Sequence, residues 1–193
     1  YQYLIALQQG QIEQAEQWLL PSIEVQYKDY ALWQRQYLQG KVLDEQLHYW
    51  QQQLADYQPL NLPTDYVRPL QVDYTGKDIS FQLDAKLSQQ LRSVAAELNV
   101  SLYSVLLSGY YLLLSAFSNQ QDIVIGTPIA GRHYQAIEQT IGLFVNTLAL
   151  RQQISAEQTL VEFIQHTGQL ISEAQKHQDL PFEKLVDVMQ IEK

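Results

Sequence analysis

The chain has 193 residues, 46% of them apolar, which is enough to bury the core of one domain or of one lobe of a larger enzyme. Its formal net charge of -9 comes from 12 basic against 21 acidic residues, so a nucleic-acid surface is not expected. The absence of cysteine excludes disulfides, thiolate nucleophiles and cysteine-ligated metals. No apolar run approaches the ~18 residues of a membrane span, and we expect a soluble, cytoplasmic protein with no membrane contact.

The first third of the chain has helical periodicity. Apolar residues recur at helical spacing from Tyr1 to Leu20 with a break at Gly10, which predicts helix ends around an exposed linker. Two amphipathic helices are expected next, over residues 27–38 and 42–54, with Gly40 as the C-cap of the first. Prolines then exclude a helix and predict an ordered loop over residues 56–76.

The remaining elements alternate between strands and helices. Ile79, Phe81 and Leu83 alternate with polar residues, which predicts a half-buried strand. Asp84 and Ser101 are placed to cap two helices, and the second is apolar nearly all round, so we expect it in the core. The other expected elements are strands at 122–129 and 144–151 and helices at 159–176 and 182–188. This order predicts an α/β fold, in the form of an α+β sandwich.

Motifs for several common chemistries are absent. The histidines have neither HxxxH nor HExxH spacing, so no metal site is predicted and solvent-facing side chains are the better interpretation of His48, His133, His166 and His177. The glycine-containing segment 126–131 lacks the GK[ST] ending of a phosphate loop, and Pro128 removes a backbone donor there. No GxSxG nucleophile elbow occurs. A stand-alone hydrolase is therefore not supported.

Three segments together resemble the condensation domains of nonribosomal peptide synthetases. Residues 27–34 (YKDYALWQ), 141–147 (IGLFVNT) and 177–183 (HQDLPFE) match that family's YxDYAxWQ, IGxFVNT and HQDxPFE motifs, in the family's order. Residues 62–65 (LPTD) and 121–132 (QDIVIGTPIAGR) resemble two further family segments. The residues that carry the motif matches are Tyr27, Asp29, Trp33, Gly142, Phe144, His177, Asp179, Pro181 and Phe182.

The resemblance implies one lobe of a two-lobed fold like that of chloramphenicol acetyltransferase. We expect residues 1–57 to be a helical lead-in from the region between the lobes and 58–193 to be the C-terminal lobe. The family's catalytic HHxxxDG motif is absent, so residues 1–193 are expected to be a partial domain that begins shortly after this motif, contains no catalytic residue and is inactive alone. The implied partners are peptidyl carrier protein domains, the N-terminal lobe and neighbouring synthetase domains. No cofactor or metal is expected in this segment, and the substrates would arrive on the 4'-phosphopantetheine of carrier proteins.

A substrate tunnel between the lobes is implied by the same resemblance, and we expect this segment to line it with Gly126, Thr127, Pro128, Ala130, Asn146 and Thr147. For Asn146, a tunnel-facing amide and a satisfied core amide are equally good interpretations. Gly142 suggests turn geometry or a close approach of the pantetheine arm, with turn geometry favoured. Arg132 is expected in a surface ion pair, with contact to an acidic partner as the less favoured alternative, and Trp33 is expected in the core.

His177 is interpreted as structural, at the entry to a short helix that has Asp179 as its N-cap and Pro181 in its first turn. Two functional hypotheses remain beside amide formation. One is a degenerate condensation-like module that docks carrier proteins without catalysis. The other is an epimerisation or cyclisation relative, which FVNT and HQDLPFE make the weaker choice.

Overall fold

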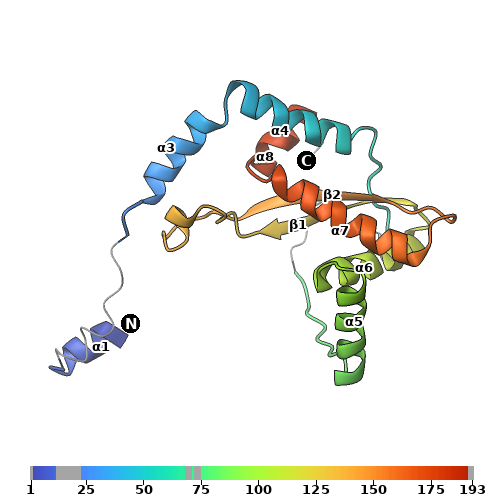
Figure 1. The fold of residues 1–193 in the computed structure, drawn as a ribbon, viewed down its shortest axis with the longest axis horizontal. Helices are drawn as coiled ribbons and strands as arrows, with labels where there is room; N and C mark the ends of the chain where they lie inside the picture. Colours follow the sequence, from blue (N-terminus) through green and yellow to red (C-terminus); the bar gives the residue numbers. More distant parts are fainter. Residues whose placement is uncertain (1, 12–22, 68–70, 72–74, 191–193) are drawn as a thin grey trace. The chain divides into compact units, whose positions relative to one another are not determined.

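The computed structural model describes residues 2–11, 23–67, 71 and 75–190, which form two compact units (Figure 1). The smaller unit combines residues 1–37 with 132–144, and the larger combines residues 38–131 with 145–193. The described chain combines helices with a two-stranded antiparallel sheet, so the prediction of a mixed α/β fold is confirmed. The expected boundary between residues 57 and 58 stays a prediction. Among the described residues no single helix is long and apolar enough to cross a membrane.

The described part of the smaller unit is helical. Its elements are α1 (Gln2–Gln8), α3 (Tyr27–Tyr37) and the short 3-10 turn η1 (Gln135–Ile137). The Asp29 carboxylate accepts a hydrogen bond from the backbone nitrogen of Gln26 at 3.0 Å, which satisfies one amide just ahead of α3. The predicted linker before Pro21 falls largely on residues 12–22, which lie outside the described residues.

The helices of the larger unit begin where local capping chemistry directs them. They are α4 (Gly40–Gln53), α5 (Ala85–Glu97), α6 (Leu102–Ser118), α7 (Leu160–Lys176) and α8 (Phe182–Met189). The side chains of Asp84 and Ser101 accept hydrogen bonds from the third residue of α5 and α6, so both predicted N-caps are confirmed. Thr159 and Glu162 form a capping box at the start of α7.

The sheet is a ribbon of β1 (Asp122–Ile129) and β2 (Asn146–Gln153), paired over their whole length from Asp122 opposite Gln153 to Ile129 opposite Asn146. Helices α6 and α7 pack against this ribbon, and the main core lies between them. Tyr111 of α6 is completely buried there, and its hydroxyl donates to the backbone oxygen of Leu150 at 2.8 Å. This bond satisfies a polar group that burial would otherwise leave unpaired.

Three local predictions are corrected by the structure. Residues 79–83 form no strand, and Ile79 and Phe81 are 90% and 82% exposed, because no described segment pairs with their backbone. Helix α6 was predicted to lie in the core, but it is buried on one side only. Its opposite side is exposed and carries Tyr103, Leu106, Tyr110, Leu113 and Phe117. Gly40 has a positive φ of 52°, but it begins α4 and does not end α3.

A paired strand ribbon as the candidate site

The strand register brings most of the predicted tunnel residues together at one end of the ribbon. Pro128 lies opposite Thr147, and Ile129 lies opposite Asn146, while Ala130 follows directly after β1. Because side chains alternate along a strand, Gly126, Pro128 and Thr147 share one face. Thr127 and Asn146 share the other face. These five residues therefore lie on opposite faces of the ribbon, and a substrate on one face would not contact the side chains of the other.

Asn146 uses its complete hydrogen-bonding capacity inside the larger unit. Its Nδ2 donates to the backbone oxygens of Gln178 and Leu180 at 3.0 and 2.9 Å. Its Oδ1 accepts from the backbone nitrogens of Thr147 and Phe182 at 2.9 and 3.0 Å. An amide has two N–H donors and two acceptor lone pairs, so this side chain is saturated. The geometry favours the interpretation of Asn146 as a satisfied amide.

His177 ends α7 and lies against α4. It is the C-cap of α7, and its Nδ1 lies 3.0 Å from the backbone oxygen of Glu173, so this nitrogen carries the proton and donates. Its ring stacks on Tyr49 with centroids 3.9 Å apart. The buried indole of Trp50 donates to the backbone oxygen of His177 at 2.9 Å. These contacts fix the end of α7 and agree with a structural interpretation of His177.

Two expectations about the start of α8 are wrong. His177 was expected to lead into α8, yet it closes the preceding helix. Asp179 was expected to be the N-cap, but Pro181 occupies that position and has no side-chain cap. The reason is geometric, because α8 begins at Phe182 and Asp179 lies too early in the turn to be its N-cap. Pro181 thus directly precedes the helix instead of lying within its first turn.

Arg132 organises the loop of the smaller unit instead of forming the expected surface ion pair. Its Nη1 donates to the backbone oxygens of Ile137, Glu138 and Thr140 at 2.7, 3.2 and 2.7 Å. Its Cζ lies 4.2 Å from the centroid of the Phe144 ring, which is a cation–π contact. A guanidinium offers five donors in a fixed plane, so it can bind several carbonyls that one loop presents together.

Gly142 lies at a bend of the chain, where it allows close packing. Its φ lies outside the left-handed region, whereas an added Cβ would lie 2.3 Å from Cδ2 of Tyr27. The Tyr27 ring is held in place because its hydroxyl donates to the backbone oxygen of Leu143 at 3.0 Å and its ring meets Phe144 edge-on. The chain does bend at Gly142, but this bend uses no left-handed conformation, and the group that approaches the glycine closely is the Tyr27 side chain.

The aromatic face of α3 is a surface cluster. Trp33 is 37% exposed and Tyr27 is 41% exposed, and no described residue of α3 is buried. The Trp33 ring stacks on Tyr37 at 4.9 Å and meets Tyr134 edge-on at 4.8 Å. The expectation of a core tryptophan is corrected, because in the described unit this helix is covered along one side only.

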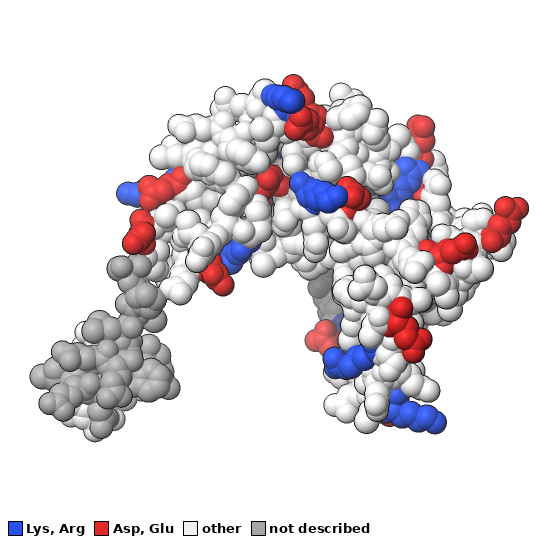
Figure 2. Space-filling model, in the orientation of Figure 1, with Lys and Arg blue, Asp and Glu red and all other residues white. Residues whose placement is uncertain are grey.

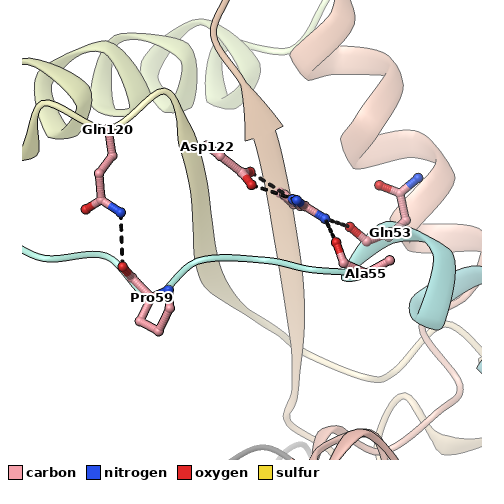
Figure 3. Close-up of polar contacts among 6 residues, drawn as sticks. Gln53, Ala55, Pro59, Gln120 and Asp122 are labelled. Carbon is pink, nitrogen blue, oxygen red and sulfur yellow. Dashed lines mark hydrogen bonds and ion pairs between the residues drawn. The ribbon is translucent and has the colours of Figure 1, made fainter.

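Arg151 joins three segments and was not identified as a site residue from the sequence. Its Nε and Nη2 donate to the two carboxylate oxygens of Asp122 at 2.8 and 2.6 Å (Figure 3). Its Nη1 donates to the backbone oxygens of Gln53 and Ala55, at the end of α4. Hydrogen bonding to Asp122 raises the pKa of Arg151. In the same region Gln120 donates to the backbone oxygen of Pro59 at 3.0 Å, which holds the following loop (Figure 3).

A cavity of about 410 Å³ lies between α4, β2 and α7. Its wall combines glutamine amides with charged, aromatic and aliphatic side chains and is formed by Tyr49, Gln52, Gln53, Arg151, Gln153, His166, Gln169, Leu170 and Glu173. The buried Tyr49 hydroxyl has no hydrogen-bond partner among the described residues. Burial, and to a smaller extent the charge of Glu173, raise the pKa of Tyr49 to about 12.

Charge does not single out a site on the face of the molecule drawn in Figure 2. Lys and Arg are scattered between Asp and Glu on the face drawn in Figure 2, without a basic patch. No cluster of three metal-ligating side chains occurs within the described ranges. His48, His133 and His166 are exposed, as expected, while His177 is half-buried. The site is therefore defined by hydrogen bonding and packing around the ribbon.

Comparison with known proteins places the chain in a family. The condensation-domain family model matches residues 10–193. Gramicidin S synthase 2 of Brevibacillus brevis is 41% identical over 175 residues, which are 90% of this chain and 4% of that protein. Tyrocidine synthase 3 of Brevibacillus parabrevis is 41% identical over the same length, 3% of that protein. The chain thus spans a small part of these relatives.

Solved structures agree with this assignment. A four-domain nonribosomal peptide synthetase bound to AMP and glycine matches 99% of this chain and 15% of its own, with 27% identity and a TM-score of 0.80. A complex of the X-domain and OxyB from teicoplanin biosynthesis matches 91% of this chain and 40% of its own, with 25% identity and a TM-score of 0.83.

This chain belongs to the condensation-domain family of nonribosomal peptide synthetases. The family resemblance that the three motifs carry is confirmed, as is the expected chloramphenicol-acetyltransferase-like fold.

Proposed function

We propose that this chain is part of a condensation domain that forms an amide bond between a donor acyl or peptidyl thioester and an acceptor aminoacyl thioester. The single observation that carries the proposal is the match of the condensation-domain model to residues 10–193. Both substrates would be held on the 4'-phosphopantetheine of peptidyl carrier proteins, and neighbouring synthetase domains would supply them.

The residues of this chain would contribute walls and orientation instead of the proton-transfer group. The face of the ribbon that carries Gly126, Pro128 and Thr147 has an exposed glycine and an exposed proline, so it leaves room for an extended arm. Fixing two tethered reactants near each other makes the reaction nearly unimolecular, which supplies much of the rate. The family's histidine motif does not occur in residues 1–193, so we expect these residues alone to be inactive.

The nature of the bond formed tests this proposal. The full-length protein that contains residues 1–193 would be incubated with a donor thioester and an acceptor aminoacyl thioester, each on a small pantetheine mimic. We expect a product whose new linkage survives hydroxylamine, because amides resist this reagent and thioesters do not. Residues 1–193 alone should give no product above the protein-free background. Donor hydrolysis without an amide product would contradict the proposal.

A degenerate module that docks carrier proteins without catalysis is the second candidate function. The observation in its favour is the likeness to the X-domain, which was solved as a complex with OxyB. This candidate predicts saturable carrier binding by the full-length protein together with no amide product in the same assay.

A further inference from the structure

Two motifs that are far apart in the sequence meet at one side chain. Asn146 belongs to the IGLFVNT segment at the start of β2. Three of its four hydrogen bonds reach backbone atoms of the HQDLPFE segment, at Gln178, Leu180 and Phe182. The fourth holds the amide of its neighbour Thr147. The turn formed by residues 178–181 therefore has its backbone fixed to the strand by a single amide.

We infer that Asn146 is a positioning residue for the proposed condensation reaction, which orients the 178–181 turn against β2 and does not contact a substrate. The inference rests on the proposed function for its link to catalysis. The statement that Asn146 does not contact a substrate rests on its saturated hydrogen bonding. Any contact from Asn146 to a substrate would require one of its four hydrogen bonds to break.

The same amide replaces a missing helix cap. Helices α5, α6 and α7 each have a capping side chain from the residue next to them, but Pro181 offers none to α8. The first N–H groups of a helix need acceptors from outside the helix. Oδ1 of Asn146 accepts from the backbone nitrogen of Phe182, the first residue of α8, at 3.0 Å. The side chain of Asn146 in β2 thus supplies the capping acceptor that Pro181, the N-cap residue of α8, cannot supply.

Contacts that do not involve the 178–181 turn hold the end of α7, directly before it. Trp50 and Gln46 of α4 donate to the backbone oxygens of His177 and Lys176, at 2.9 and 3.4 Å. These contacts do not involve Asn146, and the core around Leu148 and Leu150 lies further along β2. Loss of the Asn146 amide should therefore release the turn and the start of α8 while the rest of the unit stays folded.

Asn146→Asp tests the inference because it keeps the shape and an acceptor oxygen at the same place but removes both donors. A carboxylate would then face the carbonyl oxygens of Gln178 and Leu180, and protonation would restore one donor. Asn119→Asp is the matched control, since Asn119 is an exposed left-handed C-cap of α6. The measurement is amide hydrogen exchange over residues 178–189 in the full-length protein, at pH 5 and pH 7.5, after correction for intrinsic exchange rates.

Repulsion between the new carboxylate and the carbonyl oxygens of Gln178 and Leu180 should push the turn away from β2 and break the bond from the Phe182 nitrogen. We therefore expect Asn146→Asp to lower protection at Phe182 at least tenfold at pH 7.5 and to recover part of it at pH 5. Asn119→Asp should match the wild type at both pH values. The native charged or ionisable side chains around this segment are identical in all three proteins, so a pH effect seen only in Asn146→Asp reports the new carboxyl group; they are His177, Asp179, Glu183, Lys184 and Asp187. Unchanged protection in Asn146→Asp would overturn the inference.

Condensation kinetics add a second, separate readout. If Asn146 is a positioning residue, Asn146→Asp should lower kcat tenfold or more relative to the wild type at pH 7.5, with carrier KM within about twofold. The acceptor amine is protonated at low pH in every variant, so the expected recovery at pH 5 is in the ratio of kcat between Asn146→Asp and the wild type at that pH. A rise in KM with normal exchange protection would instead indicate direct substrate contact. If the wild type forms no amide, the proposed function fails, while the exchange result still decides the structural role of Asn146.

Discussion

Arg151 and Asp122 form a two-pronged ion pair across the ribbon, with Nη2 and Oδ2 2.6 Å apart and with side chains only 12% and 25% exposed. The same guanidinium donates to two backbone oxygens at the end of α4. The pair therefore joins β1, β2 and the loop that follows α4. Breaking such a pair leaves a poorly hydrated charge, so its loss should cost more than an exposed ion pair would.

Arg151→Lys should lower the free energy of unfolding by about 2–3 kcal/mol, because an ammonium cannot reproduce the forked geometry. Urea denaturation measures this change. Lys176→Met is the control, since its ion pair with Glu173 is exposed and should contribute less than about 1 kcal/mol. Equal effects of the two substitutions would contradict the structural role of Arg151.

Trp50→Phe isolates the indole hydrogen bond to His177. Trp50 is 2% exposed, so phenylalanine keeps most of the packing but loses the N–H donor. We expect a loss of about 1–2 kcal/mol in chemical denaturation, with the carbonyl of His177 left unpaired. Trp33→Phe on the exposed α3 cluster should cost less than about 1 kcal/mol. A larger effect at Trp33 than at Trp50 would show that the assignment of the core is wrong.

Gly142→Ala should destabilise the protein by about 1–3 kcal/mol, because its Cβ would overlap the Tyr27 ring. The free energy of unfolding measures the loss. Adding Tyr27→Ala should reduce the further cost of Gly142→Ala and leave only the tight contact of the new Cβ with the Phe144 ring at 3.1 Å. Gly109→Ala provides the comparison, since nothing lies within 4 Å of its added Cβ in α6. That change should stabilise by about 0.5–1 kcal/mol. Additive effects of Gly142→Ala and Tyr27→Ala would rule out the proposed overlap.

Tyr49→Phe tests the pKa of Tyr49, which burial raises to about 12. In an unfolded chain tyrosine titrates near pH 10, so the unfolded state loses its proton first. The contribution of Tyr49 to stability is therefore complete below about pH 10 and is lost as the pH rises toward 12. Tyr49→Phe should reduce this loss in urea denaturation between pH 9 and 12, and part should remain because burial also raises the pKa of Tyr111. At pH 7 it should cost little, because the hydroxyl is unpaired. An unchanged pH dependence would contradict the assignment.

Local signals in the sequence were enough to predict most elements. The caps Asp84 and Ser101 act on residues three positions away, so their spacing alone identifies the helix starts. A strand, in contrast, forms only when another backbone segment pairs with it, and local sequence does not identify that segment. Residues 79–83 have the alternation of a strand, yet the described chain offers their backbone no partner and Phe81 stays exposed.

Long-range polar contacts were harder to anticipate than the elements. Arg132 and Arg151 bind backbone oxygens, which every residue carries, so no side-chain pattern reveals these partners. Asn146 stood out because an amide in an apolar strand needs partners, but the sequence did not say whether they were a substrate or the chain itself. Three of the four partners proved to be backbone atoms 32 to 36 residues further along the chain, and the fourth is the backbone nitrogen of the adjacent Thr147.

The mass of the acceptor carrier protein tests the central claim most directly. The full-length protein would be mixed with one carrier that bears a donor acyl group and one that bears an aminoacyl group, and both carriers would be weighed by mass spectrometry over time. We expect the acceptor carrier to gain the mass of the donor acyl group while the donor carrier returns to its free thiol. An acceptor carrier whose mass stays unchanged while both carriers bind would contradict amide formation and support the docking module.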